Sequence, residues 1–226
     1  MRYRTVVFDF DGTVADTAQG IFESVQYALQ KLGLPPASEQ TLRRFIGPPL
    51  PYSFREFGGL PDTLADQAVL YYRENYGDQG KFKLYFYDGI PELLQSLRSL
   101  GVRTCLASAK PDRFIQQILD HFDARSWFDC AQGMPMAEQS ADKSGLILDV
   151  MNRVGAADRE QVLMVGDTKF DMLGAKELGI SALGVLYGYG SAEELTASGA
   201  DFIVHSAKEI EEVVKGDKQY NFTNSK

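Results

Sequence analysis

Short apolar runs alternate with longer segments of helical periodicity from residue 88 onward. Apolar runs at residues 102–107, 162–165, 182–186 and 202–204 are typical of buried strands, and a similar run at 6–8 opens the chain. The segments between them carry apolar residues three or four positions apart, which predicts helices. Alternating strands and helices favour a parallel sheet covered on both faces. We therefore predict an α/β fold with a doubly wound parallel-sheet (Rossmann-like) core.

Residues 18–87 follow a different pattern, because helical periodicity continues there without a strand. We expect helices over 21–32, from Ser38 toward 46, over 52–57 and from Pro61 to about 76. This block separates the first strand from the rest of the sheet. We therefore predict a small all-helical cap at 18–87, inserted into a catalytic core of residues 1–17 and 88–226. Hinges are expected near Thr17 and at 87–89.

The charge of the chain excludes some partners. Its 226 residues carry a formal net charge of −8, whereas nucleic-acid polymers and anionic membranes attract basic proteins. The two cysteines, Cys105 and Cys130, do not suggest a disulfide framework. Residues 1–4 lead directly into the first predicted strand, so we expect no signal peptide and a cytoplasmic protein. The sequence makes no prediction of the oligomeric state.

Polar side chains that can carry chemistry follow three of the predicted strands. The ligands of open parallel sheets bind beyond the carboxyl ends of the strands, so these side chains should converge. A lysine at the start of a later helix is expected to join them. The residues are Asp9 and Asp11 after the first strand, Ser108 and Lys110 after the second, Asp167 and Asp171 after the third, and Lys143.

Asp9 and Asp11 point to the same side of an extended backbone and repel one another unless a cation lies nearby. Oxygen ligands suit a hard ion such as Mg²⁺, which accepts one or two carboxylates together with a substrate phosphate. We expect Asp9 and Asp167 to hold Mg²⁺ and Lys143 to lie on the opposite side of the phosphate. No organic cofactor is expected.

The remaining residues then have tasks in cleaving a phosphate ester through an aspartyl-phosphate. Asp11 would protonate the leaving alkoxide and later deprotonate the attacking water. Ser108 would donate a hydrogen bond to a phosphate oxygen. Asp171 would help to fix the metal, directly or through a water molecule.

Four ordered motifs resemble those of the haloacid dehalogenase-like (HAD) superfamily. They are Asp9-Phe10-Asp11-Gly12-Thr13, Ser108, Lys143 and Gly166-Asp167-Thr168-Lys169-Phe170-Asp171. The helical insertion and the segments 16–21, 45–50 and 184–190 are similar to its phosphoglycolate phosphatase-like branch, which includes enzymes described as 5′-nucleotidases. The resemblance implies that Asp9 is the nucleophile and Asp11 the acid/base. It also implies that Mg²⁺ is bound by the Asp9 carboxylate, the Asp11 backbone carbonyl and Asp167.

The implied function is hydrolysis of a small-molecule phosphate monoester, with phosphoglycolate and nucleoside 5′-monophosphates as the leading substrates. Phosphoglycolate phosphatases commonly have Asn-Lys where this chain has Ala109-Lys110, so the choice between them stays open. Lys110 is also an alternative to Lys143 as the phosphate lysine. The candidate substrate contacts are Gly12, Thr13, Ala109, Lys110, Arg43 and Gly47.

Two other functions compete with a phosphatase. Sugar phosphomutases of the same superfamily carry a histidine early in the cap, where this chain has Ile21. A phospho-accepting receiver module uses a similar residue set on a parallel sheet. Such a module would lack the cap, and its phosphoacceptor would not follow the first strand.

Overall fold

A six-stranded parallel sheet forms the centre of the computed structural model, which describes residues 1–136 and 143–217. The strand order is β5-β4-β1-β6-β7-β8, so β1 lies between β4 and β6. This arrangement confirms the predicted doubly wound sheet. The strands are β1 (Thr5–Phe8), β4 (Arg103–Pro111), β5 (Cys130–Met134), β6 (Val162–Gly166), β7 (Ser181–Val185) and β8 (Phe202–Val204).

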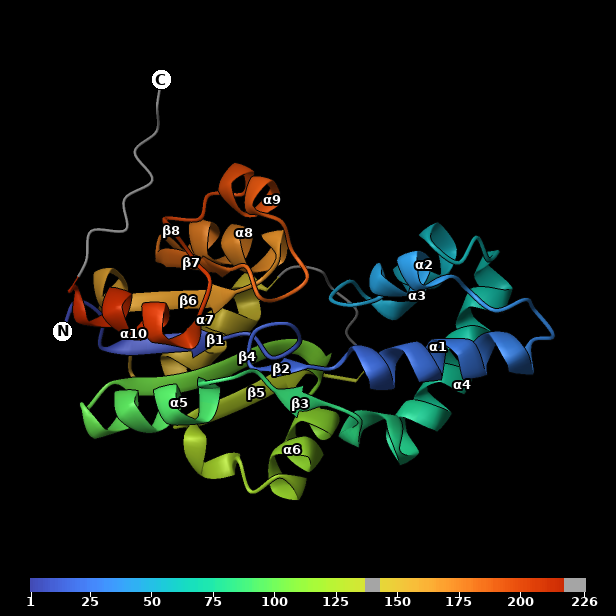
Figure 1. Cartoon of the computed structure of the whole chain (residues 1–226), viewed down its shortest axis with the longest axis horizontal. Coiled ribbons are helices and arrows are strands. Elements are labelled where there is room, and N and C mark those ends of the chain that lie inside the picture. The colour runs from blue at the N-terminus through green and yellow to red at the C-terminus, as the bar shows by residue number, and fades with distance from the viewer. Residues whose placement is uncertain (137–142, 218–226) are drawn as a thin grey trace.

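Helices cover both faces of this sheet (Figure 1). Successive side chains of a strand point to opposite faces, so Val6 and Phe8 pack into one apolar layer and Val7 into the other. The first layer contains α5 (Ile90–Ser99), α6 (Asp112–His121) and α10 (Ala207–Lys215). The second layer contains α7 (Ser144–Arg153), α8 (Lys169–Leu178) and α9 (Ala192–Ala197).

The helices between β1 and α5 form a separate lobe beside the sheet, here called the cap (Figure 1). They have their own apolar cluster, which includes Val25, Phe54 and Tyr72. Ser38 caps the second cap helix, because its hydroxyl accepts a hydrogen bond from the Thr41 N–H. The cap helices are α1 (Ala18–Lys31), α2 (Glu39–Arg43), α3 (Leu50–Glu56) and α4 (Asp62–Asp78). The domain limits at 17 and 88 stay a prediction.

Two short strands join the cap to the core. Ala15–Asp16 (β2) pairs antiparallel with Tyr85–Phe86 (β3), so both chain crossings lie side by side. Sequence periodicity did not predict these strands, because two residues are too short to show an alternation. The described residues also form the short helical turns η1 (Gly80–Phe82), η2 (Arg125–Trp127) and η3 (Arg159–Gln161).

The sequence predicted five strands in the main sheet, whereas the structure has six. The missed strand is β5, which lies at the edge of the sheet. The sequence of β5 is Cys-Ala-Gln-Gly-Met, which contains neither a β-branched nor an aromatic residue. The strand is placed by its pairing with β4 and by α6, which packs over it. Gly133 is needed there, because a Cβ would lie 2.4 Å from the Lys110 carbonyl oxygen.

Candidate active site

The predicted chemical residues meet at the carboxyl ends of β1, β4 and β6. The Asp9 N–H donates a hydrogen bond to the Val165 carbonyl (2.9 Å), which holds the residue after β1 against β6. Asp167 follows β6 directly, and Ser108 and Lys110 lie in the last part of β4. The strand order changes direction at β1, which is where open parallel sheets form a ligand crevice.

Three buried carboxylates lie together at this point. Each of Asp9, Asp167 and Asp171 has an oxygen within 4.8 Å of an oxygen of the other two. The Lys143 ammonium contacts the cluster, with Nζ 2.6 Å from Asp9 Oδ1 and 2.5 Å from Asp171 Oδ1. One ammonium group therefore lies beside a cluster of three carboxylates at the carboxyl ends of the central strands.

Burial changes the acidity of these groups. It raises the pKa of the Asp9 carboxyl to about 7, despite the opposing charge of Lys143, and the nearby charges of Asp171 and Asp11 add to the rise. Burial likewise raises the pKa of Asp167 well above its usual value. Burial alone would lower the pKa of Lys143, but the charges of Asp171 and Asp9 outweigh it and raise that pKa.

The chain holds Asp167 and Asp171 in fixed positions. Asp171 Oδ2 accepts hydrogen bonds from the N–H (3.1 Å) and the hydroxyl (3.0 Å) of Thr168. These two residues form a capping box at the N-terminus of α8. Asp167 accepts hydrogen bonds from the Tyr189 N–H (2.9 Å) and the Thr13 hydroxyl (3.3 Å). Both oxygens of Asp171 are thereby occupied, one by Lys143 and the other by Thr168.

Glycines allow the loops to approach Asp167. Gly12 has φ +86°, and a Cβ there would lie 2.0 Å from Asp167 Oδ2. A Cβ on Gly188 would lie 2.4 Å from the Cβ of Asp167. Each position therefore requires glycine, which lets the backbone of both loops lie against the Asp167 side chain.

The composition of the cluster fits a hard divalent cation. All its ligand atoms are carboxylate oxygens, they are buried, and a single ammonium leaves a negative excess. Buried charges of one sign are unfavourable without a counter-charge, and Mg²⁺ prefers oxygen ligands.

Asp11 belongs to a second group of contacts, which faces the cap. Its Oδ1 lies 3.1 Å from Lys110 Nζ and accepts a hydrogen bond from the Thr17 hydroxyl (2.5 Å). Lys110 Nζ in turn donates to the hydroxyl of Tyr76 in α4 (2.6 Å). This group therefore joins the sheet to the predicted hinge and to the cap.

A cavity of about 110 Å³ lies between the core and the cap. Asp9, Asp11, Lys110 and Lys143 line it from the core, and the cap contributes mostly apolar residues. A larger cleft of about 880 Å³ adjoins it and shares residues 48, 49, 51, 168 and 170 with it.

The structure brings most predicted site residues together. Of the predicted substrate contacts, Gly47, Ala109 and Lys110 line the cavity, whereas Gly12 and Thr13 pack against Asp167. Ser108 is fully buried, and its hydroxyl accepts a hydrogen bond from the Lys110 N–H (3.2 Å).

Arg43 lies apart from these predicted contacts. It lines the larger cleft instead of the cavity, where it forms an ion pair with Glu39 (2.7 Å). Its contact with substrate stays a prediction.

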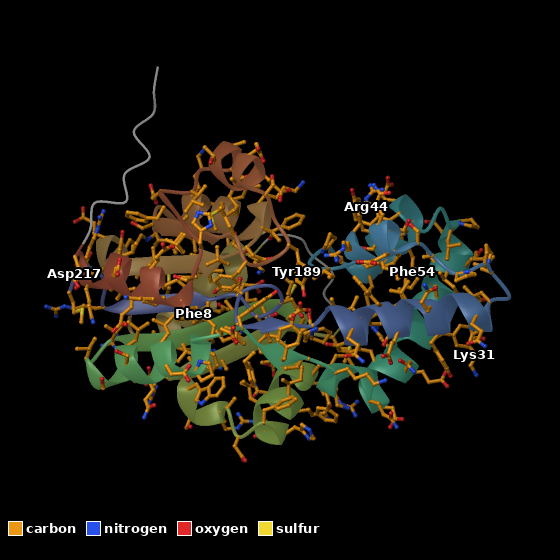
Figure 2. All side chains as sticks on the ribbon, in the orientation of Figure 1. Phe8, Lys31, Arg44, Phe54, Tyr189 and Asp217 are labelled. Carbon is orange, nitrogen blue, oxygen red and sulfur yellow. The ribbon has the colours of Figure 1, made fainter. Side chains whose placement is uncertain are left out.

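Sequence reasoning missed three residues of the site region. Tyr76 and Arg73 of α4 line the cavity, and Tyr189 contacts both Asp167 and the predicted hinge. Figure 2 shows Tyr189 at the junction of core and cap. Tyr189 lies between two glycines in the segment Tyr187-Gly188-Tyr189-Gly190. These glycines were the signal in the sequence that could have indicated a close approach of the backbone to the site. The α4 residues carry no local motif.

The fold and sequence are similar to those of known proteins. The family model described as "Haloacid dehalogenase-like hydrolase" matches residues 6–185. A crystal structure of a predicted phosphatase from Clostridium acetobutylicum has a TM-score of 0.88 and 36% sequence identity, covering 96% of this chain and 100% of that one.

Relatives with curated names differ in the activity they are named for. A 5′-nucleotidase of Pseudomonas aeruginosa is 38% identical over 87% of this chain and 89% of its own length. The tyrosine-protein kinase PtkA of Mycobacterium tuberculosis is 34% identical over 89% of this chain and 68% of its own length. A phosphoglycolate phosphatase of Vibrio parahaemolyticus is 29% identical over 93% of this chain and 96% of its own length.

Among the helices of residues 1–136 and 143–217, none has the length and apolar character needed to cross a membrane.

Proposed function

This chain belongs to the haloacid dehalogenase-like hydrolase family and is a phosphoric monoester hydrolase, and we propose that it cleaves a small phosphate ester through an aspartyl-phosphate on Asp9. The observation that carries the proposal is the position of Asp9. Its buried carboxylate lies at the floor of the cavity, beside Lys143 and among the carboxylates of Asp167 and Asp171.

Asp9 and Asp167 are proposed to hold Mg²⁺, with Asp171 adjoining and the Asp11 backbone carbonyl as a further ligand. When bound, the cation would screen the charges of Asp9 and the phosphate and stabilise the oxygens of the transition state. Lys143 neutralises the opposite side of the same carboxylates, because it contacts both Asp9 and Asp171.

Asp9 Oδ attacks phosphorus, and the ester oxygen leaves as the phosphorus–oxygen bond breaks. Asp11, which also lines the cavity, gives its proton to the leaving oxygen. Water then attacks the phosphorus of the aspartyl-phosphate, Asp11 takes the water's proton, and Asp9 is released. Ser108 is proposed to assist by orienting the phosphate. The contacts of Asp11 with Lys110 and Thr17 hold its carboxyl group at the cavity wall during both steps.

The names of the relatives leave phosphoglycolate and nucleoside 5′-monophosphates as the leading substrate classes. The test is phosphate release from both classes and from an aryl phosphate, with Mg²⁺ and with a chelator. We expect Mg²⁺-dependent release. In Asp11→Asn, an aryl phosphate with a good leaving group should leave a phosphoenzyme that intact mass spectrometry detects.

Two results would contradict the proposal. One is the absence of phosphate release from every ester in the presence of Mg²⁺. The other is transfer of the phosphate to a tyrosine peptide in preference to water.

A further inference from the structure

Three positively charged residues line the cavity, and two of them are paired with carboxylates. Lys143 contacts Asp9 and Asp171, and Lys110 contacts Asp11. The third, Arg73, comes from the cap helix α4 and has no ion pair among the described residues. Its charge is the one that the described cavity wall leaves uncompensated.

The guanidinium of Arg73 is also short of hydrogen bonds. Its terminal NH2 donates to the Met136 carbonyl at 3.4 Å, which is a long contact. Its Nε is buried and has no hydrogen-bond partner in the part of the chain that the structure describes. Leaving a buried donor of a charged group unpaired is costly, so this arrangement favours an anion beside it.

The described residues that line the cavity from the cap include no carboxylate, and Asp9 and Asp11 on the core side are already paired with lysines. The cap wall consists mainly of apolar side chains, among them Ile21, Phe45 and Leu50, and Phe114 lines the cavity from α6. Arginine binds carboxylate and phosphate groups through parallel hydrogen bonds, and such bonds strengthen where water is excluded. A ligand that enters the cavity can provide the missing partner.

We propose that Arg73 binds a second anionic group, a carboxylate or a further phosphate, on the ester that this chain hydrolyses. The proposal rests on the phosphatase function above and identifies the class of substrate. Asp9, Lys143 and Lys110 face the phosphoryl group from the core, and Arg73 holds the other end from the cap. Arg73 and Asp9 line the same cavity of about 110 Å³, which is small beside the roughly 300–1,000 Å³ of pockets for drug-sized ligands, so a short ester can reach both residues. The adjoining cleft of about 880 Å³ is lined by neither of them.

The test compares two esters that differ only in the second charge. Phosphoglycolate ends in a carboxylate, and ethyl phosphate ends in a methyl group at the same position. We expect the wild-type protein to prefer phosphoglycolate by about 10- to 100-fold in kcat/KM, which is the range for a hydrogen bond to a charged group. A small bisphosphate tests whether a phosphate is accepted in place of the carboxylate.

Arg73→Met should remove most of this preference, mainly through a higher KM for phosphoglycolate, and leave ethyl phosphate within about threefold. Arg73→Lys should keep part of it, because the positive charge remains. Arg125→Met is the matched control, since Arg125 lies on the core surface and pairs with Asp120 (2.7 Å). Calorimetry with 3-phosphonopropionate and propylphosphonate, which cannot be hydrolysed as esters, should show the same difference in binding.

The outcomes separate this proposal from the phosphatase assignment. If the wild-type protein hydrolyses both esters equally, or if Arg73→Met keeps the preference, the role of Arg73 is wrong and the phosphatase function stands. Preference for a nucleoside 5′-monophosphate that does not depend on Arg73 would also overturn it. If no ester releases phosphate, the proposed function itself fails.

Discussion

The two walls of the cavity differ in how completely their polar groups are paired. On the core wall, Asp9, Asp11 and both lysines form short contacts with one another. On the cap wall, the other residues are mostly apolar, and the Nε of Arg73 is unpaired among the described residues. The polar groups of the core wall are thus paired with one another before a ligand binds, whereas the cap wall has a guanidinium nitrogen, Arg73 Nε, that no described residue pairs.

This difference follows from how each wall is built. The core residues lie at the ends of strands that are hydrogen-bonded on both sides, so their positions follow from the sheet. The cap residues lie on helices with a separate apolar cluster, joined to the core through the β2–β3 pair. We therefore infer that the core carries the chemistry and the cap selects the substrate.

The largest effect should come from removing the nucleophile. Asp9→Asn is expected to lower phosphate release by at least about 10⁴-fold, because the amide cannot form the aspartyl-phosphate. Steady-state assays with an aryl phosphate measure the loss, and circular dichroism checks the fold. Asp66→Asn on the cap surface is the control. Substantial activity in Asp9→Asn would mean that the core wall does not carry the reaction as described.

Lys143→Met tests the charge balance of the core wall. It leaves Asp9 and Asp171 buried without their ammonium, so we expect the free energy of unfolding to fall by about 3–5 kcal/mol without metal. Denaturant unfolding in the presence of a chelator measures this. The exposed Lys176→Met should change it little. An unchanged stability would show that Lys143 does not neutralise the carboxylates.

Adding Mg²⁺ should stabilise the protein through the same wall. At 100 times its Kd, a ligand that binds only the folded state contributes about 2.7 kcal/mol, or roughly 5–10 °C in Tm for a chain of this size. Thermal scans with Mg²⁺ and with a chelator give the difference. Asp167→Asn should abolish the shift and raise the metal-free Tm, because it removes one of the buried like charges. A shift that persists in Asp167→Asn would place the cation elsewhere.

The smallest effect is expected at the junction of the two walls. The Tyr189 hydroxyl donates to Asp16 Oδ1 (2.8 Å) and accepts from the Thr17 N–H (3.2 Å). Tyr189→Phe removes both contacts and keeps the backbone bond to Asp167, so a loss of about 1 kcal/mol in stability is expected. Urea unfolding measures it, with the exposed Tyr52→Phe as control. An unaltered unfolding curve would show that this hydroxyl does not secure the hinge.

Sequence periodicity predicted the parts of the fold where burial is regular. The central strands and the helices around them came from runs such as 162–165, because apolar side chains must face the two helical layers. The edge strand β5 was missed, since its residues are held by pairing with β4 instead of by their own pattern. The pairing of β2 with β3 was missed for the same reason.

The sequence by itself determined the α/β class, the inserted helices and the set of acidic and basic residues that follow the strands. Those features depend on local order along the chain, which a sequence records directly. Only the tertiary structure decided that Lys143 contacts Asp9 while Lys110 contacts Asp11, and that Arg73 of α4 lines the same cavity. Such contacts join residues far apart in the chain, and they depend on how core and cap pack together.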